Sequence, residues 1–135
     1  ILVSGTDAVA LPCGAVTLRL PSGDSVTISG LCGNYWAVLA ADTAEKLPGG
    51  PPSPYSFVRG MTLQILQGSD AANLQTVSPL PAGVTITWTF AAAGGADAEG
   101  LYWDGGAWQP VSLAAQGGGA SVVHNNTGTL ILAAQ

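Results

Sequence analysis

The strict alternation of apolar and polar residues over Val84–Phe90 constrains the fold more than any other feature of the sequence. Every second residue of this segment is apolar, and the residues between them are threonines. A period of two places these two sets of side chains on opposite faces of a β-strand. Trp88 lies on the apolar side with Val84 and Ile86, and we therefore expect it in the core.

A second strand signal is the aromatic segment Leu101–Val111. An Asp-Gly-Gly sequence interrupts it at 104–106, and these residue types accept the backbone angles of a tight turn. The segment predicts a β-hairpin that carries Tyr102, Trp103 and Trp108. Exposed and coplanar, such rings would stack on sugar rings; turned inward, they would be core residues. The sequence leaves both interpretations open.

Similar short segments recur along the chain and are separated by turns rich in Gly, Pro, Asp and Asn. The 135 residues include 19 Gly and 9 Pro, and no repeat or domain boundary is visible. The pattern predicts an all-β fold: a single antiparallel β-sandwich domain, residues 1–135, of about eight to nine strands. The other strands are expected near Ala15–Leu20, Ser25–Ser29, Asn34–Ala40, Tyr55–Val58, Met61–Ile65, Ser121–Val123 and Thr129–Leu132.

Three segments carry more specific expectations. Residues 41–54 and 67–83 are rich in turn-forming residues and are predicted to be surface loops. Asp42-Thr-Ala-Glu45 has the form of a capping box, which predicts a single helical turn in the first of these loops. Asn34–Ala40 is a continuous apolar run, for which we expect a central strand buried on both faces.

Charged residues are scarce, at 8% of the chain, and the formal net charge is −5. The three cations, Arg19, Lys46 and Arg59, are too few and too scattered for the phosphate contacts that hold nucleic acid or an anionic membrane. No run of about 20 apolar residues exists, so no membrane-spanning helix is expected. A chain with so few charges is typical of secreted and surface-assembled β proteins, and its surface favours lateral association.

Cys13 and Cys32 are the only cysteines. In an exported chain, one pair of cysteines is most simply an intrachain disulfide, and two reduced, buried thiols are the alternative. The chain starts at Ile1 rather than at an initiator Met, and no signal sequence opens it. We therefore expect a processed protein that is secreted to the extracellular space or the cell surface.

The sequence offers little for catalysis, and we expect no enzyme, cofactor or metal site. His124 is the only histidine and is expected to be a hydrogen-bonding turn residue. The only close acidic pair is Asp97 and Glu99, which is either part of a calcium site or a solvated loop, and the loop is favoured. Lys46 is expected to be a solvated lysine rather than a partner in an isopeptide crosslink. Asn125 begins an Asn-Asn-Thr glycosylation sequon, a tripeptide that is common by chance.

A resemblance to a known class of modules covers Val84–Ala134. A Thr-rich strand, a Tyr-Trp-Asp-Gly-Gly-x-Trp-x-Pro-Val hairpin, a Gly loop and a strand entered through His-Asn-Asn-Thr-Gly-Thr follow one another there. This order resembles the C-terminal half of Ig-like and ZU5-like β-sandwich modules of bacterial surface proteins. Some ZU5-like domains cleave themselves at a His-Phe-Ser sequence in the corresponding strand. Because His124 is followed here by two asparagines, no autoproteolysis is expected.

The leading functional hypothesis is a secreted structural protein that assembles with copies of itself into a filament, pilus or surface layer. Residues 1–11 would act as a donor or edge strand that pairs with an open sheet edge of the next subunit. The apolar residues of the two terminal segments are the predicted interface: Ile1, Leu2, Val3, Val9, Leu11, Leu130, Ile131 and Leu132.

Two other classes of function are compatible with the sequence. A non-catalytic carbohydrate-binding or adhesive module would use Tyr102, Trp103 and Trp108 as its contacts with polysaccharide. A small secreted hydrolase ranks last, because it would need acids that converge in a cleft and the sequence selects none.

Overall fold

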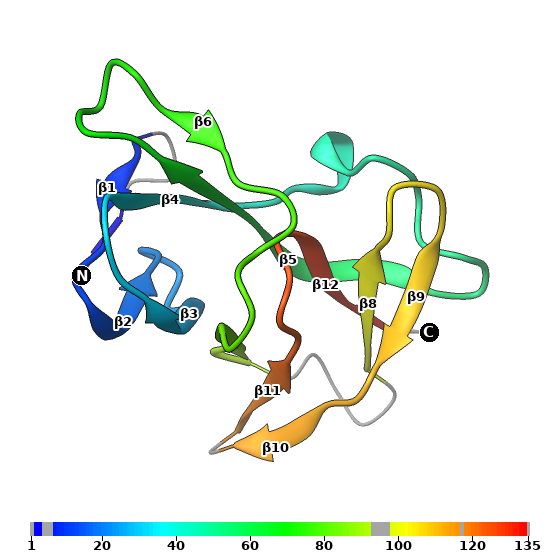
Figure 1. Ribbon diagram of the computed structural model, residues 1–135. Coiled ribbons are helices and arrows are strands. Elements are labelled where there is room, and N and C mark those ends of the chain that lie inside the picture. The colour runs from blue at the N-terminus through cyan, green and yellow to red at the C-terminus, as the bar shows by residue number, and fades with distance from the viewer. Residues whose placement is uncertain (1, 4–6, 93–97, 117, 135) are drawn as a thin grey trace.

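The computed structural model describes residues 2–3, 7–92, 98–116 and 118–134. Two antiparallel sheets pack on each other, which confirms the predicted all-β sandwich (Figure 1). Twelve strands are present in the part of the chain that the structure describes, rather than eight to nine. The additional strands are short or lie where a loop was expected.

The larger sheet has seven strands in the order β1-β4-β5-β12-β8-β9, and β6 pairs with β5 beside this path. Their bounds are β1 (Val9–Ala10), β4 (Tyr35–Ala41), β5 (Ser56–Gln67), β6 (Gln75–Thr76), β8 (Glu99–Trp103), β9 (Trp108–Val111) and β12 (Gly128–Ala134). The smaller sheet has five strands in the order β10-β11-β7-β3-β2. Their bounds are β2 (Gly14–Arg19), β3 (Ser25–Leu31), β7 (Thr85–Phe90), β10 (Ala114–Gln116) and β11 (Gly119–Val123).

The core fills the space between the two sheets. Alternate residues of β7 enter it, and Trp88 is fully buried, as its side of the strand predicted. The Trp88 indole Nε1 donates a hydrogen bond to the carbonyl of His124 at 3.0 Å, so the buried ring keeps a polar partner. The largest fully buried side chains come from both sheets: Trp88, Phe90, Leu18, Ile28, Leu39, Met61, Leu63, Ile65, Ile86, Leu130, Ile131 and Leu132.

The long strand β5 corrects the prediction of two separate strands. Arg59 and Gly60 interrupt the apolar pattern of the sequence, yet both pair with β12 inside one continuous strand. A Cβ atom at Gly60 would lie 2.4 Å from Cγ2 of Ile131. Glycine is therefore present because a neighbouring strand packs closely there, and the chain does not turn.

Residues 42–55, which we call the covering loop, lie over the outer face of the larger sheet and form a second, smaller apolar cluster with it. Its buried members are Leu101, Ile131 and Ala133, and Leu47, Tyr55, Phe57 and Trp108 pack against them. The predicted helical turn is present as a 3-10 turn, η1 (Ala44–Lys46), but the capping box is wrong. Thr43 is the N-cap and makes no side-chain capping bond, whereas the Asp42 carboxylate accepts a hydrogen bond from the Thr62 hydroxyl at 2.8 Å.

Two further expectations need correction. The predicted loop 67–83 contains β6, which pairs with the same edge of β5 as β12 does, beyond the end of β12. Strand β4 was expected to be buried on both faces. Its inward residues Ala37 and Leu39 are buried, but Trp36 and Val38 are only half-buried, because the covering loop does not reach them.

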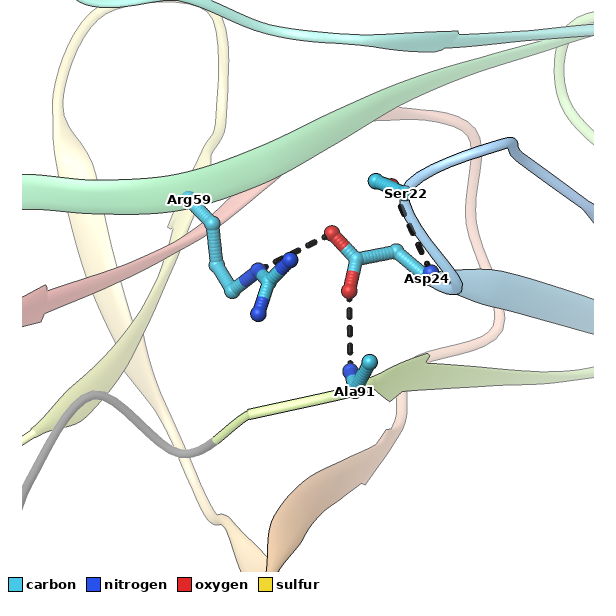
Figure 2. A network of polar contacts seen from close by, with 4 residues as sticks. All are labelled: Ser22, Asp24, Arg59 and Ala91. Atoms are coloured by element: carbon cyan, nitrogen blue, oxygen red, sulfur yellow. Dashed lines mark hydrogen bonds and ion pairs between the residues drawn. The ribbon is translucent and has the colours of Figure 1, made fainter.

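Three tethers hold the sandwich together beyond its core. The predicted Cys13–Cys32 disulfide is present and joins the start of β2 to the end of β3. The other two tethers involve Asp24, which directly precedes β3 (Figure 2). Its carboxylate accepts a hydrogen bond from the Ala91 amide at 2.8 Å and forms an ion pair with Nε of Arg59 at 3.1 Å. Because Arg59 belongs to β5, this ion pair connects the two sheets.

Candidate functional site

The aromatic hairpin forms as predicted from β8 and β9. The Asp104 amide donates to the carbonyl of Ala107 at 3.1 Å and closes the turn. Its carboxylate accepts hydrogen bonds from the amides of Gly106 and Ala107 and from the side chain of Gln109. These donors favour the charged form and lower the pKa of Asp104. The carboxylate therefore holds the turn closed.

The three aromatic side chains of the hairpin do not share one face. Tyr102 packs toward the core between the sheets, and its hydroxyl donates to the carbonyl of Thr127. Trp103 and Trp108 are cross-strand partners whose rings meet edge to face, 5.1 Å between centroids. The Trp108 indole Nε1 donates to the carbonyls of Gly49 and Gly50 at 3.1 and 3.0 Å. Both tryptophans are thus half-buried against the covering loop, and no flat three-ring platform forms.

His124 follows β11 and its ring lies against Tyr102, with 3.9 Å between ring centroids. Its backbone amide donates to the carbonyl of Ile86 at 3.0 Å. Nε2 is buried without a hydrogen-bond partner in the described part of the chain. Burial lowers the pKa of the imidazole, because the charged form loses the water that stabilises it. We find no acid–base partner for a catalytic role of His124 among the described residues.

The acidic residues of the described ranges do not converge on one metal site. Asp42 interacts with Thr62, whose hydroxyl also meets that of Thr129 at 2.8 Å, and burial raises the pKa of this carboxyl. Asp97 lies outside the described residues, so its predicted pairing with Glu99 is not tested. Within the described ranges, no three His, Cys, Asp or Glu side chains gather as metal ligands. No helix in those ranges is long and apolar enough to cross a membrane.

The surface is hollowed where the chain crosses from β9 to β10. Two hollows of about 440 and 370 Å³ share Val111, Ser112 and Leu113. Glu99 lines the first, and Val123, which is 65% exposed, lines the second. Glu99 is known from the sequence as one of a close acidic pair, but the sequence does not predict these hollows. The signal available was the apolar pair Val111 and Leu113 beyond the hairpin, where a sandwich chain must change sheets.

The opposite flank carries the predicted N-terminal interface residues. Leu2 forms a parallel bridge with Arg19 of β2, and the Val3 amide donates to the Arg19 carbonyl at 2.9 Å. Val3 is buried, whereas Leu2 is 70% exposed. Further along, β1 pairs with β4 and the Leu11 amide donates to the Tyr35 carbonyl. Val9 and Leu11 pack at the margin of the core.

The predicted C-terminal interface residues have a different position. Leu130, Ile131 and Leu132 are fully buried in β12, which lies between β5 and β8 inside the larger sheet. These three side chains have no exposed surface for a neighbour in this arrangement. Ile1 lies outside the described residues.

Two predicted modification positions lie at the surface. Lys46 is exposed on η1, in agreement with a solvated lysine. Asn125 is exposed in the turn before β12, and its side-chain oxygen accepts a hydrogen bond from the Ile86 amide at 2.9 Å.

No protein-family model, curated protein or solved structure matches the chain.

Proposed function

We propose that this protein is a secreted structural subunit that associates with copies of itself into an extracellular filament, pilus or surface layer. Its disulfide supports an oxidising, extracellular location. Its low charge supports association, because charged side chains on sheet edges are the usual defence against pairing between subunits. The resemblance of residues 84–134 to bacterial surface modules agrees with this proposal and stays a prediction.

The observation that carries the proposal is how the segment 2–11 attaches to the rest of the domain. Its described backbone contacts are edge contacts: Leu2 and Val3 meet the end of β2, and Val9–Leu11 meet β4. The side chain of Val3 is buried in the core. Pro12 and the disulfide-bonded Cys13 follow immediately. The disulfide fixes the chain at that point, so the segment before it can pair with the same edges of a neighbouring copy while the body of the domain stays intact. Such an exchange is β-strand addition with native contacts.

Self-association is tested by light scattering over a concentration series of the secreted protein. The proposal predicts species that grow with concentration. A single species of the chain mass, 13.4 kDa, at every concentration would contradict it.

The strand-addition route has its own test, because Val9 and Ala37 are directly paired residues of β1 and β4. In a Val9→Cys, Ala37→Cys variant, oxidised within the assembled state, exchange predicts disulfide-linked ladders on a denaturing, non-reducing gel. Linkage confined to monomers would reject exchange and leave self-association by other surfaces. A variant with Val9→Cys alone is the matched control.

Polysaccharide binding is the second candidate function, favoured by the half-buried Trp103 and Trp108 at the tip of the hairpin. It predicts retention on an insoluble glycan that is lost in Trp103→Ala. Equal retention of this variant and the parent protein would remove Trp103 from any such site. The variant Trp36→Ala, changed at a half-buried ring on β4, is the control for nonspecific effects.

A further inference from the structure

The two flanks of the sandwich differ in shape and in charge. One flank comprises β1, β2 and Leu2, and the other comprises β8, β9, β10 and the crossover between the sheets. Figure 1 shows β1 and β2 on the side of the N label, β8 and β9 on the side of the C label, and β10 at the bottom of the view. A subunit with unlike opposite flanks can associate head to tail.

The first flank projects an apolar side chain beside a cation. Leu2 and Arg19 are bridge partners, so their side chains lie on the same side of the pairing. Both are exposed, and the buried Val3 next to Leu2 fixes the segment that presents them. This flank therefore offers a protruding leucine and a positive charge.

The second flank is hollow and carries an anion. Its two hollows border the crossover Val111–Leu113, and exposed Val123 and Glu99 stand at their walls. The apolar side chains suit an apolar insert, and the carboxylate suits a cation beside it.

The positions of the three cations indicate which of them could pair with Glu99 of another copy. Of the three cations in the chain, Arg59 is paired with Asp24 between the sheets. Lys46 lies on the covering loop near Asp42, where its charge offsets a small part of the rise in the pKa of Asp42 that burial causes. Arg19 and Glu99 make no ion pair with any residue in the described ranges. Among the exposed charges that lack an ion pair in the described ranges, Arg19 and Glu99 thus have opposite sign and lie on opposite flanks.

We propose that these flanks form a head-to-tail contact between copies of this chain. Leu2 of one copy enters the hollows beside Val111–Leu113 of the next, and Arg19 of the first copy pairs with Glu99 of the second. This inference rests on the proposed self-association and names two surfaces for it that need no exchange of residues 2–11. Because the contact joins two different surfaces, it propagates into an open filament unless the rotation between copies closes a ring.

Charge reversal tests the contact. The concentration above which polymers form is measured by sedimentation for the parent protein and for Arg19→Glu, Glu99→Arg and the double variant. Each single reversal places like charges together and is expected to raise that concentration at least about tenfold. The double variant restores opposite charges and is expected to return to within about threefold of the parent.

Two further variants sharpen the test. Leu2→Ser removes the apolar insert from an exposed position, so the fold is retained and the polymer-forming concentration is expected to rise about tenfold or more. Lys46→Glu makes the same charge change as Arg19→Glu, but Lys46 lines neither hollow, and no change is expected. Polymers of the parent that are unaffected by Arg19→Glu and Leu2→Ser would overturn this contact and leave the proposed function standing. A parent protein that never polymerises would overturn both.

Discussion

The ion pair between Asp24 and Arg59 gives a quantitative test of how the two sheets are held together. The Asp24 side chain is 3% exposed and that of Arg59 is 25% exposed. The Asp24 carboxylate oxygens accept hydrogen bonds from two donors, Nε of Arg59 at 3.1 Å and the amide of Ala91 at 2.8 Å. Replacing Asp24 by Ala leaves a half-buried guanidinium and a backbone amide without partners.

The expected loss follows from these contacts. Breaking a fully buried pair costs about 3–5 kcal/mol, because one charge stays buried and uncompensated. Arg59 still reaches water, so we expect Asp24→Ala to lower the free energy of unfolding by about 2–4 kcal/mol. Asp24→Asn keeps an acceptor for Ala91 and should lose about 1–2 kcal/mol. In the double variant Asp24→Ala, Arg59→Ala, neither charge is stranded, so the loss should be smaller than the sum of the two single losses.

Urea unfolding followed by tryptophan fluorescence measures these differences. Asp70→Ala is the matched control, because Asp70 accepts the Ala72 amide at 2.9 Å in an exposed turn, and it should lose less than about 1 kcal/mol. The reasoning would be refuted if Asp24→Ala were no more destabilising than Asp70→Ala, or if the double variant showed the plain sum of the single losses.

Three other perturbations follow from the structure. Replacing Cys13 and Cys32 by Ala frees a loop with a sequence separation of 19 residues, and urea unfolding should show a loss of about 3 kcal/mol; an unchanged midpoint would contradict the tether. Gly60→Ala places a Cβ 2.4 Å from Ile131 and should cost about 1–3 kcal/mol in the same assay, whereas Gly50→Ala, with no atom within 4 Å of its added Cβ, should cost much less. For His124, burial lowers the pKa below the ordinary value of 6.5, so the unfolded chain binds the proton more readily; stability should fall as the pH drops from about 6.5 through the folded pKa. His124→Phe should lose this part of the pH dependence, and an unchanged pH profile would show that His124 is not its source.

Much of the fold was predictable because a strand with one buried face has apolar residues at every second position. The alternation in Val84–Phe90 and the turn residues at 104–106 each report a local fact, the face of a strand and the geometry of a turn. Strand β5 was divided wrongly, because the glycine at position 60 is required by Ile131, a residue distant in sequence. Strands β6 and β10, of two and three residues, are too short for a periodic pattern to show.

The candidate site was predictable in part. Tyr102 and Trp103 are adjacent in a strand, so their side chains must point to opposite faces; this signal was in the sequence and argues against one shared platform. The hollows beside Val111–Leu113 could not be predicted, because they depend on how the crossover lies against both sheets. The same holds for the pairing of Leu2 with Arg19, since a two-residue contact between edges has no periodic pattern.

Electron microscopy of the natively secreted protein, with light scattering of the same sample, tests the central claim of self-association most directly. The account predicts regular filaments or sheets, with scattering mass far above that of one chain. A uniform monomer of 13.4 kDa with no ordered assemblies would contradict it, and the half-buried tryptophans of the hairpin would then become the leading candidate for function.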